Sequence, residues 1–311
     1  MHHLATVIAA SVLLATAAGA APKACGDDVD GRGTAVPCDC GDVLVGSRTL
    51  TDADPLVQHP CDTTALVVDV PADRTGPTLR LAGHLVRGRG RGFGLQVLRA
   101  GSTGLHLIGP GEVRGFDVGV VAWGGTLASA DGVVAAENHS DGFEVNGTGY
   151  AITACEAVGN GRDGFALRGR AFRVDGSRAR QNRRFGFRIV GADAALGTAQ
   201  ENEASGNGRG GIVVAGTGHA IDGTVVSVNG GAGVRARVRG GRIANTFALG
   251  NAADGVRASG TDLTVSGNEA RDNRRRGIAV RGLRVRDGGG NGASGNAAGR
   301  APQCAVGHGC R

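Results

Sequence analysis

The chain has 311 residues, of which 58 are glycine and only 3% are aromatic. So many glycines with so few large side chains cannot fill a wide globular core, which excludes ordinary globular domains and leaves a narrow core of thin, repeated layers. The net charge is +6, and all 34 basic residues except Lys23 are arginine; an arginine bias of this kind is typical of a GC-rich genome, so charge alone argues only weakly for an anionic partner.

The first 20 residues have the pattern of a signal peptide. The run from Leu4 to Ala18 is apolar and uncharged, and Ala18-Gly19-Ala20 supplies the small residues of a cleavage site. The run is shorter than the roughly 20 apolar residues of a membrane span, and nothing similar follows it. We therefore predict a signal peptide over 1–20, a mature chain from Ala21 without a transmembrane segment, and a secreted, periplasmic or cell-surface location.

All seven cysteines lie in the mature part, which fits an oxidising compartment. Four lie near the front and two near the end, where disulfides would close the open ends of a repeat fold. Four front cysteines allow three pairings, so the connectivity stays open. A zinc site is the competing interpretation, but the Cys-x-Cys at 38 and 40 lacks a second pair. The disulfide candidates are Cys25, Cys38, Cys40, Cys61, Cys304 and Cys310.

Asparagine recurs through the mature chain at spacings of 22 to 25 residues, and glycine followed by an apolar residue keeps the same phase. Two markers in one phase predict a solenoid of about 22-residue coils. At a tight bend, asparagine tolerates left-handed backbone angles, and its amide can bond the amides above and below it in a ladder. The ladder residues are Asn138, Asn160, Asn182, Asn207, Asn229, Asn251, Asn273 and Asn296.

Between the markers, apolar and polar residues alternate as in strands. Three residues before each ladder asparagine is a small apolar residue, such as Ala157 or Ala179. Five residues before it is a small polar residue, and Cys155 occupies this column with Ser177 in the next coil. We predict that Cys155 is a buried free thiol, because no histidine is stacked beside it to act as a base.

No linker divides the chain, so we predict one domain after the signal peptide. Residues 21–65 form a cysteine-rich N-terminal cap with the first strands, residues 66–298 form the β-helix, and residues 299–311 form a C-terminal tail closed by a disulfide. Segments 66–68 and 79–88 have the alternation of opening coils.

The repeat resembles the right-handed β-helix repeat family of the pectin-lyase-like superfamily, in its exported bacterial members. The resemblance rests on the Asn-Gly-Arg-Asp-Gly-Phe block at 160–165, its relatives down the chain, and the segment at 79–85. It implies an all-β fold, a single-stranded right-handed parallel β-helix. Many relatives bind or cut acidic polysaccharides, but their catalytic motifs are missing here, and the only lysine, Lys23, precedes the coils.

Outward positions on the first strand of each coil hold arginines that stack into an intermittent basic stripe, interrupted by Glu144, Val190 and Val213. A guanidinium fork suits the carboxylate or sulfate groups of an extended glycan. The competing interpretation is that solvated arginines on an arginine-rich protein have no ligand. The predicted ligand-binding residues are Arg168, Arg188, Arg235, Arg237, Arg257 and Arg281.

Asp141 and Asp163 precede glycine in consecutive coils and are the best candidates for catalysis. Stacked roughly 5 Å apart, they would share a proton or hold Ca²⁺. Asp-Gly is also a common turn dipeptide, and we favour that interpretation. The sequence predicts no metal site and no required cofactor, with Ca²⁺ as the only cation considered.

These patterns predict an exported monomer that presents an extended surface. The first hypothesis is non-enzymatic binding of acidic extracellular polysaccharide, or a structural role in the cell envelope, because most coils are near-minimal and lack long loops that build a cleft. The second is a polysaccharide lyase, hydrolase or epimerase with an unrecognised carboxylate site. Nucleic-acid binding is not expected, since the chain has one Trp and one Tyr.

Overall fold

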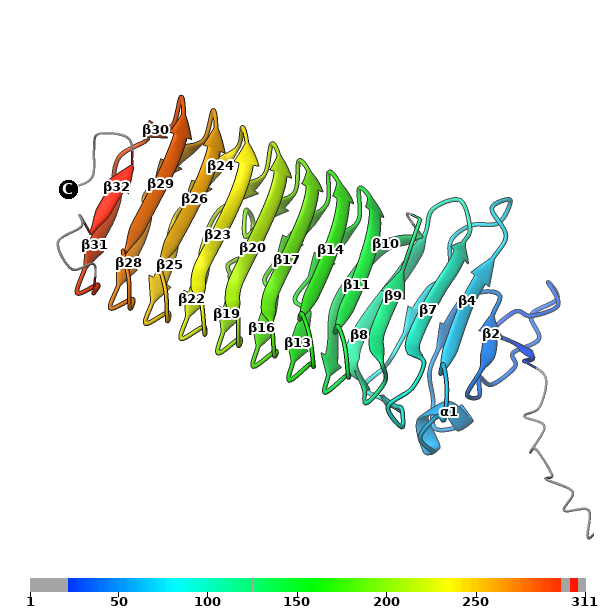
Figure 1. Ribbon diagram of the computed structural model, residues 1–311. Coiled ribbons are helices and arrows are strands. Elements are labelled where there is room, and N and C mark those ends of the chain that lie inside the picture. The colour runs from blue at the N-terminus through cyan, green and yellow to red at the C-terminus, as the bar shows by residue number, and fades with distance from the viewer. Residues whose placement is uncertain (1–21, 125, 298–302, 307–311) are drawn as a thin grey trace, which may run out of the picture.

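The computed structural model describes residues 22–124, 126–297 and 303–306. These residues form an elongated stack of coils in which each strand pairs in parallel with strands of the coils before and after it (Figure 1). The described part contains a single four-residue helix, α1 (Pro55–Gln58), beside the first coils. No helix in these ranges is long and apolar enough to cross a membrane. The predicted signal peptide lies outside the described residues.

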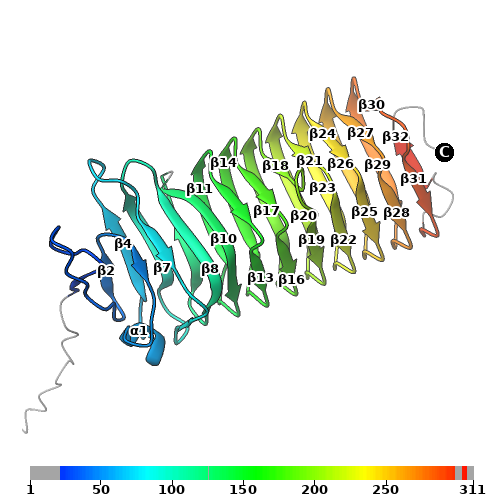
Figure 2. The ribbon, with the colours of Figure 1, turned by 180° about the vertical axis from the view of Figure 1, so that it is seen from behind.

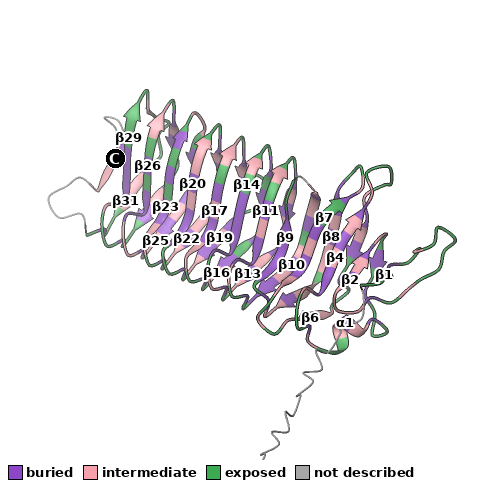
Figure 3. Cartoon of the chain, turned by 45° about the vertical axis from the view of Figure 1, so that its right-hand side comes forward, coloured by how far each residue is buried: buried purple, intermediate pink, exposed green. Residues whose placement is uncertain are grey.

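One face of the stack is a continuous 13-stranded parallel sheet, here called the front sheet. Its alternating residues point into the core and to solvent, so buried and exposed positions alternate along the strands (Figure 3). In order along the stack, its strands are β1 (Ala24–Cys25), β2 (Asp42–Leu44), β4 (Leu66–Val70), β7 (Phe93–Ala100), β9 (Val118–Ala122), β11 (Phe143–Thr148), β14 (Phe165–Arg170), β17 (Phe185–Ala192), β20 (Gly210–Thr217), β23 (Ala232–Arg239), β26 (Val256–Thr261), β29 (Ile278–Leu283) and β32 (Cys304–Val306).

The remaining strands form two further parallel ladders, which merge at β8 (Leu105–Arg114) and β10 (Leu127–Ala136) because these long strands take part in both (Figure 2). The first ladder also contains β3 (Arg48–Thr49), β5 (Thr78–Arg80), β12 (Ala151–Thr153), β15 (Arg173–Asp175), β18 (Ala195–Leu196), β21 (Ala220–Ile221), β24 (Arg242–Ala244), β27 (Thr264–Ser266) and β30 (Arg286–Asp287). The second also contains β6 (Leu85–Arg87), β13 (Glu156–Val158), β16 (Arg178–Arg180), β19 (Asn202–Ser205), β22 (Thr224–Ser227), β25 (Thr246–Leu249), β28 (Glu269–Arg271) and β31 (Gly292–Ser294).

The predicted fold class, an all-β single-stranded parallel β-helix, is confirmed by this topology. Front-sheet pairing begins at β1, within the segment predicted as the cap and first strands, and β32, within the segment predicted as the tail, pairs with β29. Buried Leu44 and Val306 give these end segments inward side chains that continue the core.

The core consists of columns of like side chains stacked along the axis. Phe143, Phe165 and Phe187 lie ring on ring at centroid separations of 4.9 and 4.8 Å, with ring planes within 8° of parallel. The small apolar slot before the asparagines is completely buried, as at Ala157 and Ala179. It admits only small residues because the glycine that begins the next strand lies against it: a Cβ on Gly164 would lie 3.2 Å from the Cβ of Ala157.

The asparagine column is a continuous buried ladder. Each side-chain Nδ2 donates to the Oδ1 of the next asparagine, as from Asn207 to Asn229 at 3.0 Å, and each Oδ1 also accepts the backbone N–H of the asparagine before it. Nδ2 donates a second bond to a carbonyl of the preceding coil, as from Asn229 to Ala204 at 3.0 Å. At the end of the column, Gln303 supplies Oε1 to Asn296 and so closes the ladder. The bends are therefore held from coil to coil by side chains as well as by backbone.

A second column, which our sequence analysis missed, consists of glycines near the ends of the front-sheet strands. Gly169, Gly191 and Gly216 pair in register, and their φ angles lie between 127° and 144°. A Cβ on Gly191 would lie 1.8 Å from the carbonyl oxygen of Gly169. These positions need glycine both for the backbone angle and for the close approach of the next coil.

The N-terminal cap is held by two disulfides, Cys25–Cys38 and Cys40–Cys61. This settles the open pairing of the four front cysteines. The predicted partner at the other end, Cys310, lies outside the described residues.

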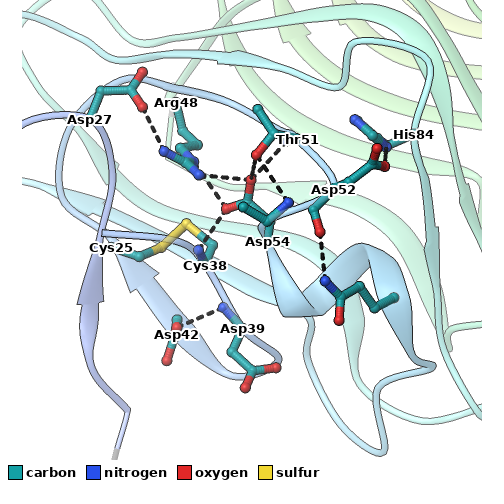
Figure 4. A network of polar contacts seen from close by, with 12 residues as sticks. Cys25, Asp27, Cys38, Asp39, Asp42, Arg48, Thr51, Asp52, Asp54 and His84 are labelled. Atoms are coloured by element: carbon teal, nitrogen blue, oxygen red, sulfur yellow. Dashed lines mark hydrogen bonds and ion pairs between the residues drawn. A yellow bond between two sulfur atoms is a disulfide. The ribbon is translucent and has the colours of Figure 1, made fainter. Parts of the chain in front are cut away.

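Beside the Cys25–Cys38 bridge is a buried ion pair (Figure 4). The guanidinium of Arg48 donates to both carboxylate oxygens of Asp54, at 3.0 and 2.8 Å. Asp54 also accepts the backbone N–H groups of Cys38 and Thr51. Burial alone raises the pKa of Asp54, but the bonds from Arg48 and the two backbone groups outweigh it and hold that pKa below its usual value. The cap therefore depends on an ionised carboxylate that is fully buried.

We expect acid to loosen this cap. Because the pKa of Asp54 is lowered in the folded state, its stabilisation is complete above the unfolded pKa of about 4 and is lost as the pH falls through the folded value. Protonation should cost on the order of 1–3 kcal/mol, because bonds to charged groups are worth about that much. Hydrogen exchange of residues 23–61, corrected for intrinsic rates between pH 6 and pH 2, measures it. Asp54→Asn should weaken protection at pH 6 and flatten the pH dependence; a wild-type cap that stays fully protected at pH 2 would contradict the prediction.

Candidate functional site

The outward side chains of the front sheet fall into columns set by strand register. One column contains Glu144, Arg188, Val213, Arg235 and Arg257, with Ala166 between the first two. The neighbouring column runs through Asn146, Arg168, Val190, Ala215, Arg237, Ser259 and Arg281. The predicted basic stripe is therefore two interrupted columns on one face, and it is dense only over β23, β26 and β29.

At this dense end the side chains enclose a groove of about 420 Å³. Four of the six predicted ligand-binding arginines line it: Arg235, Arg237, Arg257 and Arg281. The structure adds Arg275 and Arg276, which come from the turn before β29, and Ser259 on the floor. Six arginines surround a single carboxylate, that of Asp254. We call this feature the arginine groove.

Most arginines of the groove have no acidic partner. Within residues 22–124, 126–297 and 303–306, the only ion pair in the groove joins Arg257 to Asp254, at 3.9 Å. Elsewhere on the stack some arginines are paired, as Arg180 is with Glu203 at 2.7 Å and Arg99 with Asp69. Guanidinium groups gathered without counter-charges create a positive potential that an anionic ligand would relieve. Single unpaired arginines, such as Arg168, also occur elsewhere, so the groove is distinguished by the convergence of six arginines around one carboxylate.

Sequence reasoning missed Arg275 and Arg276 because they lie in a bend and not on a strand. The signal was present as the run Arg274-Arg275-Arg276 directly before Gly277. Residues at this bend lie at the lateral edge of the front sheet, where they border the outward columns. Side chains of the bends therefore act as walls of the face that the strands form.

Arg168 and Arg188 lie outside the groove. Arg168 is exposed on β14 and Arg188 is half-buried on β17, so both share the face with the groove but are separated from it by Val190, Val213 and Ala215. They are in no ion pair among the residues that the structure describes. The structure thus brings four of the predicted arginines together and leaves these two as isolated charges along the same face.

The aspartates singled out for catalysis are engaged by the backbone. Asp141 Oδ1 accepts the N–H of Asp163 at 2.8 Å, and Asp163 Oδ1 accepts the N–H of Phe185 at 3.2 Å. Asp254 makes the same bond to the N–H of Arg276 at 3.1 Å. Each carboxylate thus fastens its bend to the next coil.

Asp141 has a pKa above its usual value, chiefly because of burial and further because of the neighbouring Asp163 charge. However, Asp141 is only 6% exposed and Asp163 only 1%. Both carboxylates are thus largely covered and bonded to the backbone of the next coil. The geometry therefore supports the turn interpretation for this pair.

Residues 118–236 match the family model described as a right handed beta helix region. This chain is a right-handed parallel β-helix protein. Among curated protein sequences none matches it. The match confirms the resemblance and the handedness expected from the repeat.

Three solved structures resemble the β-helix. The periplasmic alginate epimerase AlgG has a TM-score of 0.42 and 12% identity, covering 80% of this chain and 72% of AlgG. The Dettilon tailspike protein gp208 has a TM-score of 0.39 and 13% identity, over 82% of this chain and 59% of the tailspike. The A-module of the Azotobacter vinelandii mannuronan C-5 epimerase AlgE4 has a TM-score of 0.38 and 13% identity, over 82% of each chain. Similarity at this level carries no argument about ligand or activity.

Two other groups in the β-helix have reactive side chains. Cys155 is a buried free thiol, as predicted, and burial raises its pKa to about 12, so it offers no thiolate near neutral pH. Within the described part of the chain, Asp39, Cys40 and His59 lie close enough to form a metal site. Cys40 is bonded to Cys61, and a disulfide sulfur is not the thiolate that metals bind. Neither group forms a competing site.

Proposed function

We propose that this exported β-helix binds an acidic polysaccharide, without chemical turnover, along the outer face of the front sheet. The observation that carries the proposal is the arginine groove, in which six arginines face one carboxylate and five of the six form no ion pair in the described part of the chain. Guanidinium groups bind carboxylates and sulfates through paired, charge-assisted hydrogen bonds.

An extended polymer suits the site better than a compact anion. The groove lies over β23, β26 and β29, and the two outward columns that contribute to it extend along the same face to Arg168 and Arg188. Stacked strands repeat about every 4.8 Å, so charges at matching positions repeat at a similar interval. A linear polymer with regularly spaced acidic groups presents its charges in the same way. The two disulfides of the cap fit an oxidising, extracytoplasmic location for such a ligand.

We expect charge reversal in the groove to abolish most of this binding. The double variant Arg235→Glu/Arg257→Glu removes two adjacent guanidinium groups and adds two repelling carboxylates. Affinity for polygalacturonate should fall at least about tenfold, and wild-type binding should weaken as salt is raised. Calorimetric titration of the mature protein measures both effects.

The matched control is Arg80→Glu/Arg87→Glu, which makes the same charge change at exposed residues on β5 and β6, away from the front sheet. This variant should bind as the wild type does. Equal affinity of all three proteins, or no binding of polygalacturonate, alginate or chondroitin sulfate by the wild type, would refute the proposal. Release of shortened or unsaturated sugars during titration would show that the protein is an enzyme instead.

A further inference from the structure

The only tryptophan of the chain is exposed on the face that carries the arginine groove. Trp123 follows β9 and is 45% exposed, whereas the six largest buried rings have almost no exposed surface. The core thus uses phenylalanine and tyrosine and leaves its one indole outside. A single exposed ring is ordinary on a protein surface, so the case for a site depends on the groups that surround the indole.

Two contacts orient the indole of Trp123. Its ring meets the edge of Phe93 at a centroid separation of 6.2 Å and an angle of 78°. Its Nε1 donates to Glu144 Oε1 at 3.4 Å. We call Trp123, Phe93 and Glu144 the tryptophan platform.

The platform has the composition of a sugar-binding surface. The C–H groups on one face of a sugar ring pack against an aromatic plane, and the hydroxyls around the ring bond to nearby carboxylates and amides. Glu144 supplies a carboxylate at the indole edge, and Asn146 supplies an exposed amide on the same strand. A fixed ring costs less ordering entropy on binding than a mobile one, so its two contacts favour affinity.

The platform and the groove lie on one line along the front sheet. From β9 the sheet runs through β11, β14, β17 and β20 to β23, where the groove begins. Five strand steps span about 24 Å, and Arg168 on β14 lies between the two sites in the column of Asn146 and Arg237. A 1,4-linked sugar residue is about as long as one strand step of ~4.8 Å. One chain of about six residues would therefore reach both sites.

We infer that the tryptophan platform is a second binding site, specific for an uncharged face of a sugar ring, and that one glycan chain occupies it together with the arginine groove. This inference rests on the proposed function and specifies its ligand. The ligand is an acidic polymer in which one apolar face of each sugar ring is free to contact the indole. Short anionic fragments and single acidic sugars bind only in the groove.

Galacturonate oligomers of defined length test the inference, with Trp123 as an intrinsic reporter because it is the only tryptophan. Oligomers of six or more residues should change its fluorescence and bind about tenfold tighter than the trimer. Trp123→Ala should leave trimer affinity in the groove unchanged and reduce hexamer affinity to the trimer value. Trp123→Phe, which keeps a ring, should bind the hexamer with intermediate affinity in calorimetry.

The possible results separate this inference from the proposed function. If the hexamer binds and loses affinity in Arg235→Glu/Arg257→Glu, but neither tryptophan emission nor Trp123→Ala affinity changes, the platform is overturned and groove binding stands. If neither trimer nor hexamer binds the wild type, the proposed function fails and the platform with it. Thermal unfolding of both Trp123 variants verifies that they are folded.

Discussion

Replacing Asn229 by alanine is expected to destabilise the central coils by about 3–5 kcal/mol, since each buried polar group left without a partner costs roughly 1–3 kcal/mol. The Oδ1 of Asn229 accepts both the backbone N–H and the Nδ2 of Asn207, and its Nδ2 donates to Ala204 and Asn251. Alanine removes all four bonds. Water cannot replace them readily, because Asn229 is only 1% exposed.

The loss should be local as well as global, because coils of a solenoid contact chiefly their neighbours. Denaturant unfolding measures the total change, and native-state hydrogen exchange of peptides that contain Asn207 measures the opening of the coil. Asn146→Ala is the matched control, because Asn146 is exposed on β11 and should change stability by less than about 0.5 kcal/mol. Equal stability of the two variants would mean that the ladder contributes nothing beyond the backbone pairing.

The sequence predicts this fold well because each coil places the same types of residue at the same positions. In one coil, Asn160 marks the bend, Gly164 the start of the strand and Phe165 the first inward side chain. Once these positions are identified, the matching residues of the later coils take the same roles. Inward and outward positions follow from alternation alone, so the face that carries Arg235 and Arg237 could be predicted without coordinates.

The composition of the arginine groove and the role of Trp123 could not be predicted from the sequence. Both depend on contacts between neighbouring columns of side chains, and the repeat pattern does not specify these contacts. The stripe of six arginines was expected to be one feature, but register assigns Arg168 and Arg188 to different columns and places neither in the groove. Arg275 and Arg276 complete the groove from a bend whose side-chain directions alternation does not give. Trp123 lies at a strand end outside the regular repeat, so no column of like residues indicated its role.

Gly191→Ala is expected to be among the most destabilising additions of a single methyl group to the stack. The new Cβ would lie 1.8 Å from the carbonyl oxygen of Gly169 and 2.9 Å from its carbon. Both are backbone atoms of the neighbouring coil, so the clash is relieved only by separating two paired strands. We expect a loss of about 4 kcal/mol or more, or failure to fold, as for severe overpacking.

Gly149→Ala isolates the backbone-angle contribution, because Gly149 has a φ of 73° and nothing lies within 4 Å of its added Cβ. It should cost only about 1–2 kcal/mol, the penalty for a left-handed angle. Val238 lies between Gly216 and Gly260 in the same column, and its φ is not positive. A side chain is thus accepted in the column where the backbone angle is ordinary. Denaturant unfolding and the soluble yield of both variants decide the matter: if Gly191→Ala is no less stable than Gly149→Ala, the close approach of the coils is not what requires glycine.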